Sequence, residues 1–217
     1  MTRTRGVRAI TVGPFQENCY LLTDGETPDA VLVDPGDEGA RLVAAIEDGG
    51  FVLRALWITH GHIDHVGAIA DVKRRFDVPV CLHPADRPLY DRATEQGRLY
   101  GLHVETPPPP ERALADGDAL TVGALTFHVM HVPGHSPGHV AFVGHGMVFG
   151  GDCLFAGSIG RTDLPLSDPR ALTRSLERFA ALPADTVVHP GHGPATTIGE
   201  ENRSNPFLNG AVRPISR

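Results

Sequence analysis

The chain has 217 residues, of which 41% are hydrophobic and 21% charged, and its formal net charge at pH 7 is -7. This length and composition indicate one globular domain spanning residues 1–217 and exclude a chain that is disordered throughout. The acidic balance, with no lysine or arginine cluster longer than "KRR", argues against nucleic acid as the main partner.

Targeting and redox signals point to one compartment. No run of about 18 apolar residues is present, which argues against a membrane-spanning helix and a membrane partner. The basic N-terminus is followed by no apolar segment of signal-peptide length, and the three cysteines are widely spaced. We therefore predict a cytoplasmic protein with reduced thiols, and no pattern specifies its oligomeric state.

The first third of the chain alternates between two periodicities. Apolar or alternating segments predict strands at 7–12, 18–23, 30–34, 52–59 and 78–83. Apolar residues at helical spacing predict helices at 38–47 and 64–76. Strands alternating with helices indicate a layered α/β fold.

The rest of the chain repeats this order after a variable middle. Residues 84–118 are predicted as loop and short helix, with the surface loop "TPPPP" at 106–110. Strands are predicted at 119–132, with a hairpin turn through Gly123, and at 139–144, 146–152 and 185–193. A helix at 168–182 is predicted to begin with Ser167 or Asp168 as its N-cap and Pro169 in its first turn.

The segment "WITHGHIDHVGA" (57–68) concentrates residues that bind metals, placing His60, His62, Asp64 and His65 where a strand gives way to a helix. In an extended segment side chains two apart point the same way, so His60 and His62 can bind one ion. The turn into the helix directs Asp64 and His65 toward a second ion. Four such groups exceed what one zinc site takes from one segment, so the cluster predicts two metals.

Further ligands are predicted at the ends of later strands, among glycine and proline. They are His135 in "HVPGHSPGHV", Asp152 in "FGGDCLF" and His192 in "VVHPGHGP". Seven ligands suffice for His60, His62 and His135 on one ion, Asp64, His65 and His192 on the other, and Asp152 between them. Two ions about 3.5–4 Å apart would share a water molecule as hydroxide.

These motifs resemble a known ligand series. The pattern THxHxDHxG, then the PGH histidines, GD and PGHG is similar to that of the metallo-β-lactamase superfamily, over roughly residues 10–195. The segment "GDCLFAGSIGRTDLP" (151–165) and the tail "TTIGEENRSNPFL" resemble the short bacterial glyoxalase II-like (hydroxyacylglutathione hydrolase-like) hydrolases. The resemblance implies an αββα sandwich, with two mixed sheets between helical layers and a dinuclear site at one edge.

The activity that this resemblance implies is metal-dependent thioester hydrolysis. Two zinc ions, with iron or manganese as alternatives, would hold a bridging hydroxide that attacks the acyl carbonyl, and Asp64 would orient this hydroxide as well as bind metal. The leaving thiolate, with a conjugate-acid pKa near ~8.5, needs no acid catalyst. The expected partner is a small acyl-thiol such as S-lactoylglutathione or the adduct of another thiol, since the chain ends before the helical extension of full-length glyoxalase II.

Two residues are candidates for binding substrate. Arg161 is expected to reach a substrate carboxylate or, alternatively, to pair with Asp163. Ser158 is expected to shape a backbone pocket together with Gly157 and Gly160 or, alternatively, to serve only the turn in which these residues lie. Of the remaining histidines, His139 and His189 are candidates to steady a metal ligand.

Three other functions fit the same pattern. A mononuclear iron persulfide dioxygenase would use an open facial site on the same fold. A lactone or carboxyl-ester hydrolase would use the same nucleophile, whereas a non-catalytic metal-binding module would turn over no ester. Metal content and an ester panel discriminate among them.

Overall fold

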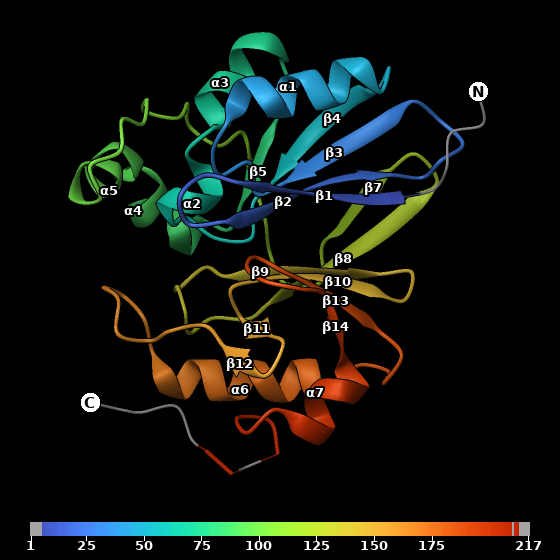
Figure 1. Cartoon of the computed structure of the whole chain (residues 1–217), viewed down its shortest axis with the longest axis vertical. Coiled ribbons are helices and arrows are strands. Elements are labelled where there is room, and N and C mark those ends of the chain that lie inside the picture. Colours follow the sequence, from blue (N-terminus) through green and yellow to red (C-terminus); the bar gives the residue numbers. More distant parts are fainter. Residues whose placement is uncertain (1–5, 210, 213–217) are drawn as a thin grey trace.

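The computed structural model describes residues 6–209, 211 and 212. Two six-stranded sheets face each other, and helices cover their outer faces, so Figure 1 shows four layers. The first sheet has the strand order β1 (Gly6–Val12), β2 (Glu17–Thr23), β3 (Asp29–Val33), β4 (Val52–Trp57), β5 (Val80–Leu82), β6 (Arg112–Ala113). The second has the order β14 (Thr196–Thr197), β13 (Val187–Pro190), β10 (Met147–Gly151), β9 (Val140–Gly144), β8 (Leu125–His131), β7 (Ala119–Val122).

Both sheets are mixed, as predicted. In the first sheet β1, β2 and β3 are antiparallel, and β3 to β6 run parallel. In the second sheet β10 and β13 form the parallel pair, and the other pairs are antiparallel. The parallel pairs place several strand ends at one edge, where loops leave the sheets.

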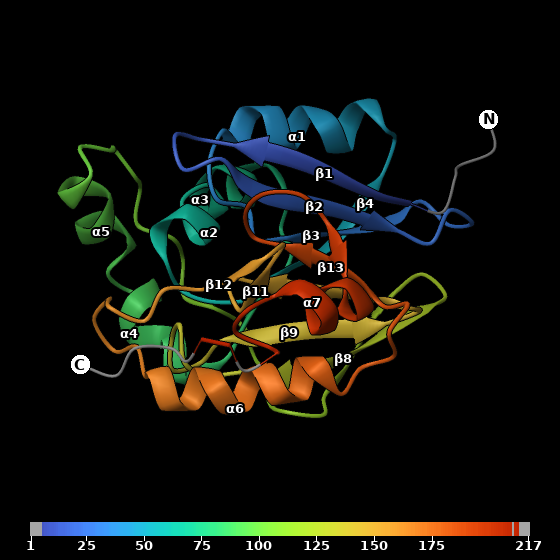
Figure 2. The ribbon, with the colours of Figure 1, turned by 60° about the horizontal axis from the view of Figure 1, so that its bottom comes forward.

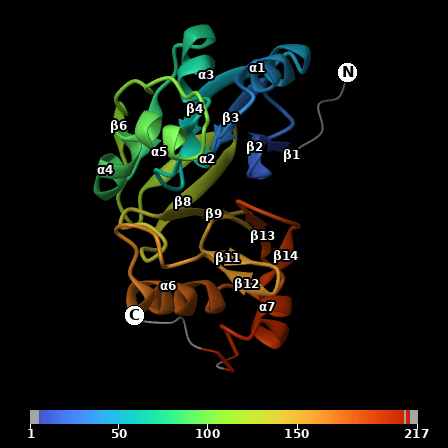
Figure 3. The same ribbon diagram turned by 60° about the vertical axis from the view of Figure 1, so that its left-hand side comes forward.

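The helices form two outer layers and a side group. Helices α1 (Gly39–Asp48) and α3 (Ile69–Arg75) cover the first sheet, and α6 (Pro169–Ala180) and α7 (Ile198–Ser204) cover the second (Figure 1). The side group is α2 (Ile63–Val66), η1 (Pro84–Asp86), α4 (Arg87–Tyr90) and α5 (Ala93–Leu99). Figure 2 shows that α5 stands beside the sandwich rather than over either sheet, and Figure 3 shows this side of the molecule turned forward. None of the helices in the described part of the chain is long and apolar enough to cross a membrane.

Three apolar clusters hold these layers together. Between the sheets, Trp57 packs against Phe142 with ring centroids 5.3 Å apart. A second cluster joins the first sheet to α1 and α3, and a third joins the second sheet to α6 and α7. Each fully buried large side chain contributes about 1.5–3 kcal/mol relative to exposure, so the sandwich is a rigid support for the loops at its edge.

Two local predictions are confirmed. The β7–β8 hairpin turns through Gly123, whose positive φ of 54° favours glycine. Helix α6 has Asp168, not Ser167, as its N-cap, because the Asp168 carboxylate accepts hydrogen bonds from the backbone of Arg170 and Ala171.

Other predictions need correction. The helix predicted at 64–76 is two helices, because the Ala68 amide donates to the carbonyl of Pro35 and a Cβ at Gly67 would lie 2.4 Å from the carbonyl of Gly36. The strand predicted at 52–59 ends at Trp57, and the one at 185–193 is only β13. The sequence analysis missed helix α7 and four short strands: β6, β11 (Leu154–Phe155), β12 (Ser158–Ile159) and β14.

Candidate metal centre

The edge of the sandwich brings all seven predicted ligands together. The loop after β4 and helix α2 carry His60, His62, Asp64 and His65. The loops after β8, β10 and β13 carry His135, Asp152 and His192. Because these strands are held in two packed sheets, residues far apart in the sequence lie within bonding reach of common points.

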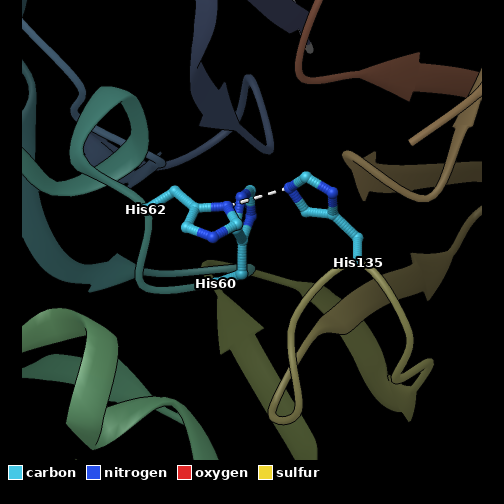
Figure 4. Close-up of side chains that lie close together, drawn as sticks. All are labelled: His60, His62 and His135. Carbon is cyan, nitrogen blue, oxygen red and sulfur yellow. Dashed lines mark hydrogen bonds between the residues drawn. The ribbon is translucent and has the colours of Figure 1, made fainter. Parts of the chain in front are cut away.

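The first group consists of His60, His62 and His135, whose ligand atoms lie within 4.8 Å of one another. Figure 4 shows His60 and His62 on one loop and His135 opposite, on the loop between β8 and β9. His62 Nδ1 and His135 Nε2 are 2.9 Å apart. Three histidine nitrogens grouped in this way are a ligand set that metal sites in proteins commonly use.

The second group consists of Asp64, His65 and His192, also within 4.8 Å of one another. His192 Nε2 lies 3.2 Å from Asp64 Oδ2. Asp152 stands between the groups: its Oδ1 is 3.4 Å from His65 Nε2, and its Oδ2 is 3.6 Å from His135 Nε2. This is the position that a bridging carboxylate requires.

Four of the histidines have their ring orientation fixed at Nδ1 by an oxygen atom, which leaves Nε2 directed at the centre. The pairs are His60 with Thr59 Oγ1 at 3.1 Å, His65 with Asp34 Oδ2 at 3.1 Å, His135 with the Arg161 carbonyl at 2.8 Å and His192 with the Phe15 carbonyl at 3.1 Å. A carbonyl or carboxylate only accepts, so Nδ1 carries the proton and Nε2 has a free lone pair. The Thr59 hydroxyl donates to Asp34, so it likewise accepts from His60.

Unpaired buried atoms test whether this set fits a metal. His60 Nε2, His65 Nε2 and Asp152 Oδ1 are buried, and none has a hydrogen-bond partner among the described residues. An unsatisfied buried polar group costs about 1–3 kcal/mol, so three of them facing one centre need a shared partner. A divalent cation satisfies imidazole and carboxylate ligands together, and the residues therefore fit a metal.

The electrostatics of the centre favour the same conclusion. Burial lowers the pKa of His60 well below its usual range, and burial with the nearby His135 lowers the pKa of His62 to about 3. Burial raises the pKa of Asp152, but His65 lowers it more, so the pKa falls below its ordinary value. Neutral imidazole and ionised carboxylate are the forms that bind metal.

His65 has the opposite shift. Burial lowers its pKa, but the carboxylates of Asp152 and Asp64 outweigh burial and hold the pKa well above its ordinary value. These carboxylates thus favour positive charge at His65, and a bound cation supplies that charge in place of the proton.

The sequence analysis missed Asp34, which connects two ligands. Its Oδ1 accepts from the Thr59 amide at 2.7 Å, and its Oδ2 accepts from the Thr59 hydroxyl at 2.6 Å and faces His65 Nδ1. Its backbone has a φ of 52°, which is uncommon for aspartate. The available signal was a carboxylate directly after the buried strand "AVLV".

The sequence analysis also missed Asp86, a fully buried carboxylate at the end of η1. Asp86 accepts hydrogen bonds from the Gly61 amide at 2.8 Å, from the Ser136 hydroxyl at 2.7 Å and from the Gly138 amide. Gly61 lies between His60 and His62, and Ser136 follows His135. Asp86 therefore joins the two loops that carry the first ligand group.

Close packing at the centre requires glycine at position 191. A Cβ on Gly191 would lie 2.2 Å from Asp152 Oδ1 and 2.7 Å from His65 Cε1. The glycine of "PGHG" thus gives the ligands room.

His139 and His189, the two histidines predicted to steady a metal ligand, differ in their contacts with the ligands. His139 Nε2 accepts from the Asp152 amide at 3.0 Å, and its ring stacks on His60. His189 packs against Phe149 and Tyr20. His139 therefore supports the ligand backbone, whereas the structure shows no contact between His189 and a ligand among the described residues.

A cavity of about 430 Å³ opens onto the centre. Both predicted substrate residues, Ser158 and Arg161, line it. The Arg161 guanidinium makes two hydrogen bonds of 2.7 Å to the carboxylate of Asp163, so the alternative pairing is the one that the structure shows. Contact of Arg161 or Ser158 with substrate stays a prediction.

The fold and the centre define a class of protein: an αββα sandwich with two adjoining histidine and aspartate groups at the edge of its sheets. Residues 12–192 match the family model described as "Metallo-beta-lactamase superfamily". The chain belongs to the metallo-β-lactamase superfamily.

One curated relative and two solved structures are similar to this chain over more than 90% of its length. The chain is 40% identical to hydroxyacylglutathione hydrolase GloC of Haemophilus influenzae, over 94% of this chain and 98% of the relative. It is 51% identical to TTHA1623, solved in a di-iron-bound form, with a TM-score of 0.87 and coverage of 93% and 100%. It is 38% identical to the B3 metallo-β-lactamase BLEG-1, with a TM-score of 0.88 and coverage of 94% and 100%. The metal-binding cluster and the di-iron relative support a dinuclear site, while the relatives' names state different reactions.

Proposed function

We propose that the chain is a dinuclear metal-dependent hydrolase that cleaves a thioester of a low-molecular-weight thiol. The observation that carries this proposal is the pair of three-residue ligand groups with Asp152 between them. His60, His62 and His135 would hold one ion, Asp64, His65 and His192 would hold the other, and Asp152 lies between the two groups. The hydroxyacylglutathione hydrolase named among the relatives supports a thioester as substrate.

We assign zinc as the metal in both positions, with iron or manganese as alternatives. The donor set is five imidazoles and two carboxylates, a set that suits zinc and also suits iron. The di-iron-bound relative keeps iron among the alternatives. Metal analysis of protein purified from cells grown with each metal tests this assignment.

Two cations held by these residues would supply Lewis-acid chemistry, since they would lower the pKa of water toward neutrality and offset negative charge on the carbonyl oxygen. Asp64, whose Oδ2 lies 3.2 Å from His192 Nε2, would orient the attacking oxygen as well as hold metal. The new carbon–oxygen bond forms as the carbon–sulfur bond breaks, and the electron pair leaves with sulfur. A thiolate leaves without an acid because the pKa of its conjugate acid is near ~8.5.

Thioester turnover and metal content together test the proposal. The zinc-loaded protein is expected to hydrolyse S-lactoylglutathione or an acyl ester of N-acetylcysteamine and to contain two ions per chain. His62→Ala and Asp152→Ala are expected to reduce turnover to background and to lower the metal content. His128→Ala is the matched control, because His128 is an exposed histidine on β8 and should keep both properties.

Three outcomes would contradict the proposal. Full turnover by either ligand variant would refute the ligand assignment. A single ferrous ion with sulfite formation from a persulfide would favour the dioxygenase. Turnover of lactones or carboxyl esters but of no thioester would favour the other hydrolases.

A further inference from the structure

Apart from the metal ligands and Gln96, Ser158 and Arg161, the side chains that line the cavity at the metal centre are apolar. The apolar lining comes from the β1–β2 loop, from α4 and α5, and from the segment after Asp152. It includes Phe15, Leu89, Leu99, Tyr100, Phe155 and Leu164. Small-molecule pockets of this volume are usually apolar, with a few polar groups that set the orientation.

Two of these polar side chains, Gln96 and Arg161, already have hydrogen-bond partners within the protein. Gln96 donates from its amide to the carbonyls of Gly61 and Leu89 and accepts from the Ile63 amide. Arg161 is held by Asp163 through two hydrogen bonds. Arg161 is the sole lysine or arginine among the described residues that line the cavity, so its wall presents no uncommitted cation for a substrate carboxylate.

Apolar side chains are also unusually exposed at the rim. Leu99 is 84% exposed and Tyr100 54% exposed at the end of α5, and both line the cavity. Tyr100 makes an edge contact with Phe15 across the entrance, with ring centroids 5.0 Å apart. A large apolar group covering this rim would be removed from water, which favours its binding.

We propose that the cavity selects the substrate by an apolar, uncharged acyl group, and that the carboxylates of a thiol such as glutathione add little to recognition. This inference rests on the proposed thioester hydrolysis and names the substrate class for the same site. The acyl chain lies against Leu99, Tyr100 and Phe15, and the thioester carbonyl faces the metal centre.

A two-by-two set of substrates tests this selection on the zinc-loaded protein. Hexanoyl and lactoyl groups are each esterified to glutathione and to N-acetylcysteamine, and kcat/KM is measured for all four. A buried methylene is worth about fourfold in binding, so hexanoyl is expected to exceed lactoyl by at least about tenfold on either thiol. Changing the thiol at constant acyl group is expected to alter kcat/KM by less than about threefold. A higher kcat/KM for lactoylglutathione than for both hexanoyl esters would overturn the proposal.

A variant of the rim assigns this preference to the cavity. Leu99→Ser is expected to reduce the advantage of hexanoyl over lactoyl at least about threefold, because an exposed side chain is removed without disturbing the core. Val52→Ser is the matched control, since Val52 is 42% exposed and does not line the cavity. An unchanged preference in Leu99→Ser would contradict the role of the rim. A specific loss for the glutathione esters in Arg161→Ala would show instead that Arg161 leaves Asp163 for a substrate carboxylate.

A binding measurement separates failure of the inference from failure of the proposed function. N-(2-acetamidoethyl)hexanamide, in which NH replaces the sulfur of the hexanoyl thioester of N-acetylcysteamine, is titrated into the zinc-loaded protein by calorimetry. Binding that weakens in Leu99→Ser but not in Val52→Ser supports the apolar site even if no thioester is hydrolysed. Absence of binding alongside turnover of lactoylglutathione refutes the apolar site and leaves the proposed function standing.

Discussion

Replacement of Asp86 is expected to lower both stability and metal affinity. In Asp86→Ala the buried amides of Gly61 and Gly138 lose their acceptor, whereas the Ser136 hydroxyl is able to rotate toward another partner. Each stranded amide costs about 1–3 kcal/mol, so the free energy of unfolding is expected to fall by about 2–6 kcal/mol. Asp86→Asn keeps the shape of the side chain but turns one hydrogen-bond acceptor into a donor. The free energy of unfolding is expected to fall by about 2–3 kcal/mol in this variant.

Two measurements separate a positioning role from a purely structural one. Urea unfolding of the metal-free protein gives the stability change, and competition with a chelating dye gives the zinc affinity of the folded variant. Because Asp86 joins the loop of His60 and His62 to the loop of His135, zinc affinity is expected to fall about 10–100-fold, as for other groups that orient metal ligands. Asp91→Asn, which alters an exposed carboxylate paired with Arg87, should change stability by less than about 0.5 kcal/mol.

Unchanged zinc affinity in Asp86→Asn would refute the positioning role, even if the protein were destabilised. A change in unfolding free energy below about 0.5 kcal/mol would refute the argument that the two amides depend on this carboxylate.

Two further predictions concern the ligand loops and an acidic turn. Gly191→Ala is expected to lower zinc content and turnover together, because the added Cβ would displace Asp152 Oδ1. The near-ultraviolet circular dichroism spectrum is expected to stay native. Full zinc loading of this variant would contradict the packing argument. Backbone hydrogen bonds from Thr27 and Ala124 hold the pKa of Asp24 at about 2, below its unfolded value, so its stabilising contribution is present above about pH 4 and is lost as the pH falls through 2. In metal-free protein, Asp24→Asn should thus be less stable than the wild type at pH 6, and the difference in stability should shrink toward pH 2. A difference in stability that does not depend on pH would show that Asp24 is not stabilised as the carboxylate.

The candidate ligands were predictable because each lies in a short segment with its own glycines. His60, His62 and His65 lie within six residues beside Gly61 and Gly67, Gly151 precedes Asp152, and Gly191 precedes His192. The mixed α/β character also followed from alternating periodicities, and the confirmed hairpin and N-cap depend on local backbone preferences. The specific four-layer arrangement came from resemblance to a family rather than from these patterns.

The features that escaped prediction depend on contacts between distant segments. The break between α2 and α3 is set by the carbonyl of Pro35, about 30 residues earlier in the chain. Asp86 acquires its role only when the loops of Gly61 and Ser136 meet it. Two-residue strands such as β14 are too short to show any periodicity.

The carbonyls that hold His135 and His192 belong to Arg161 and Phe15, two residues whose side chains line the cavity. Each loop thus contributes its main chain to ligand orientation and its side chain to the cavity wall. A substitution at either position exchanges the side chain but leaves the carbonyl in place. The acyl preference of this scaffold should therefore be open to redesign at positions 15 and 161 without loss of the metals, provided that the course of the main chain is preserved.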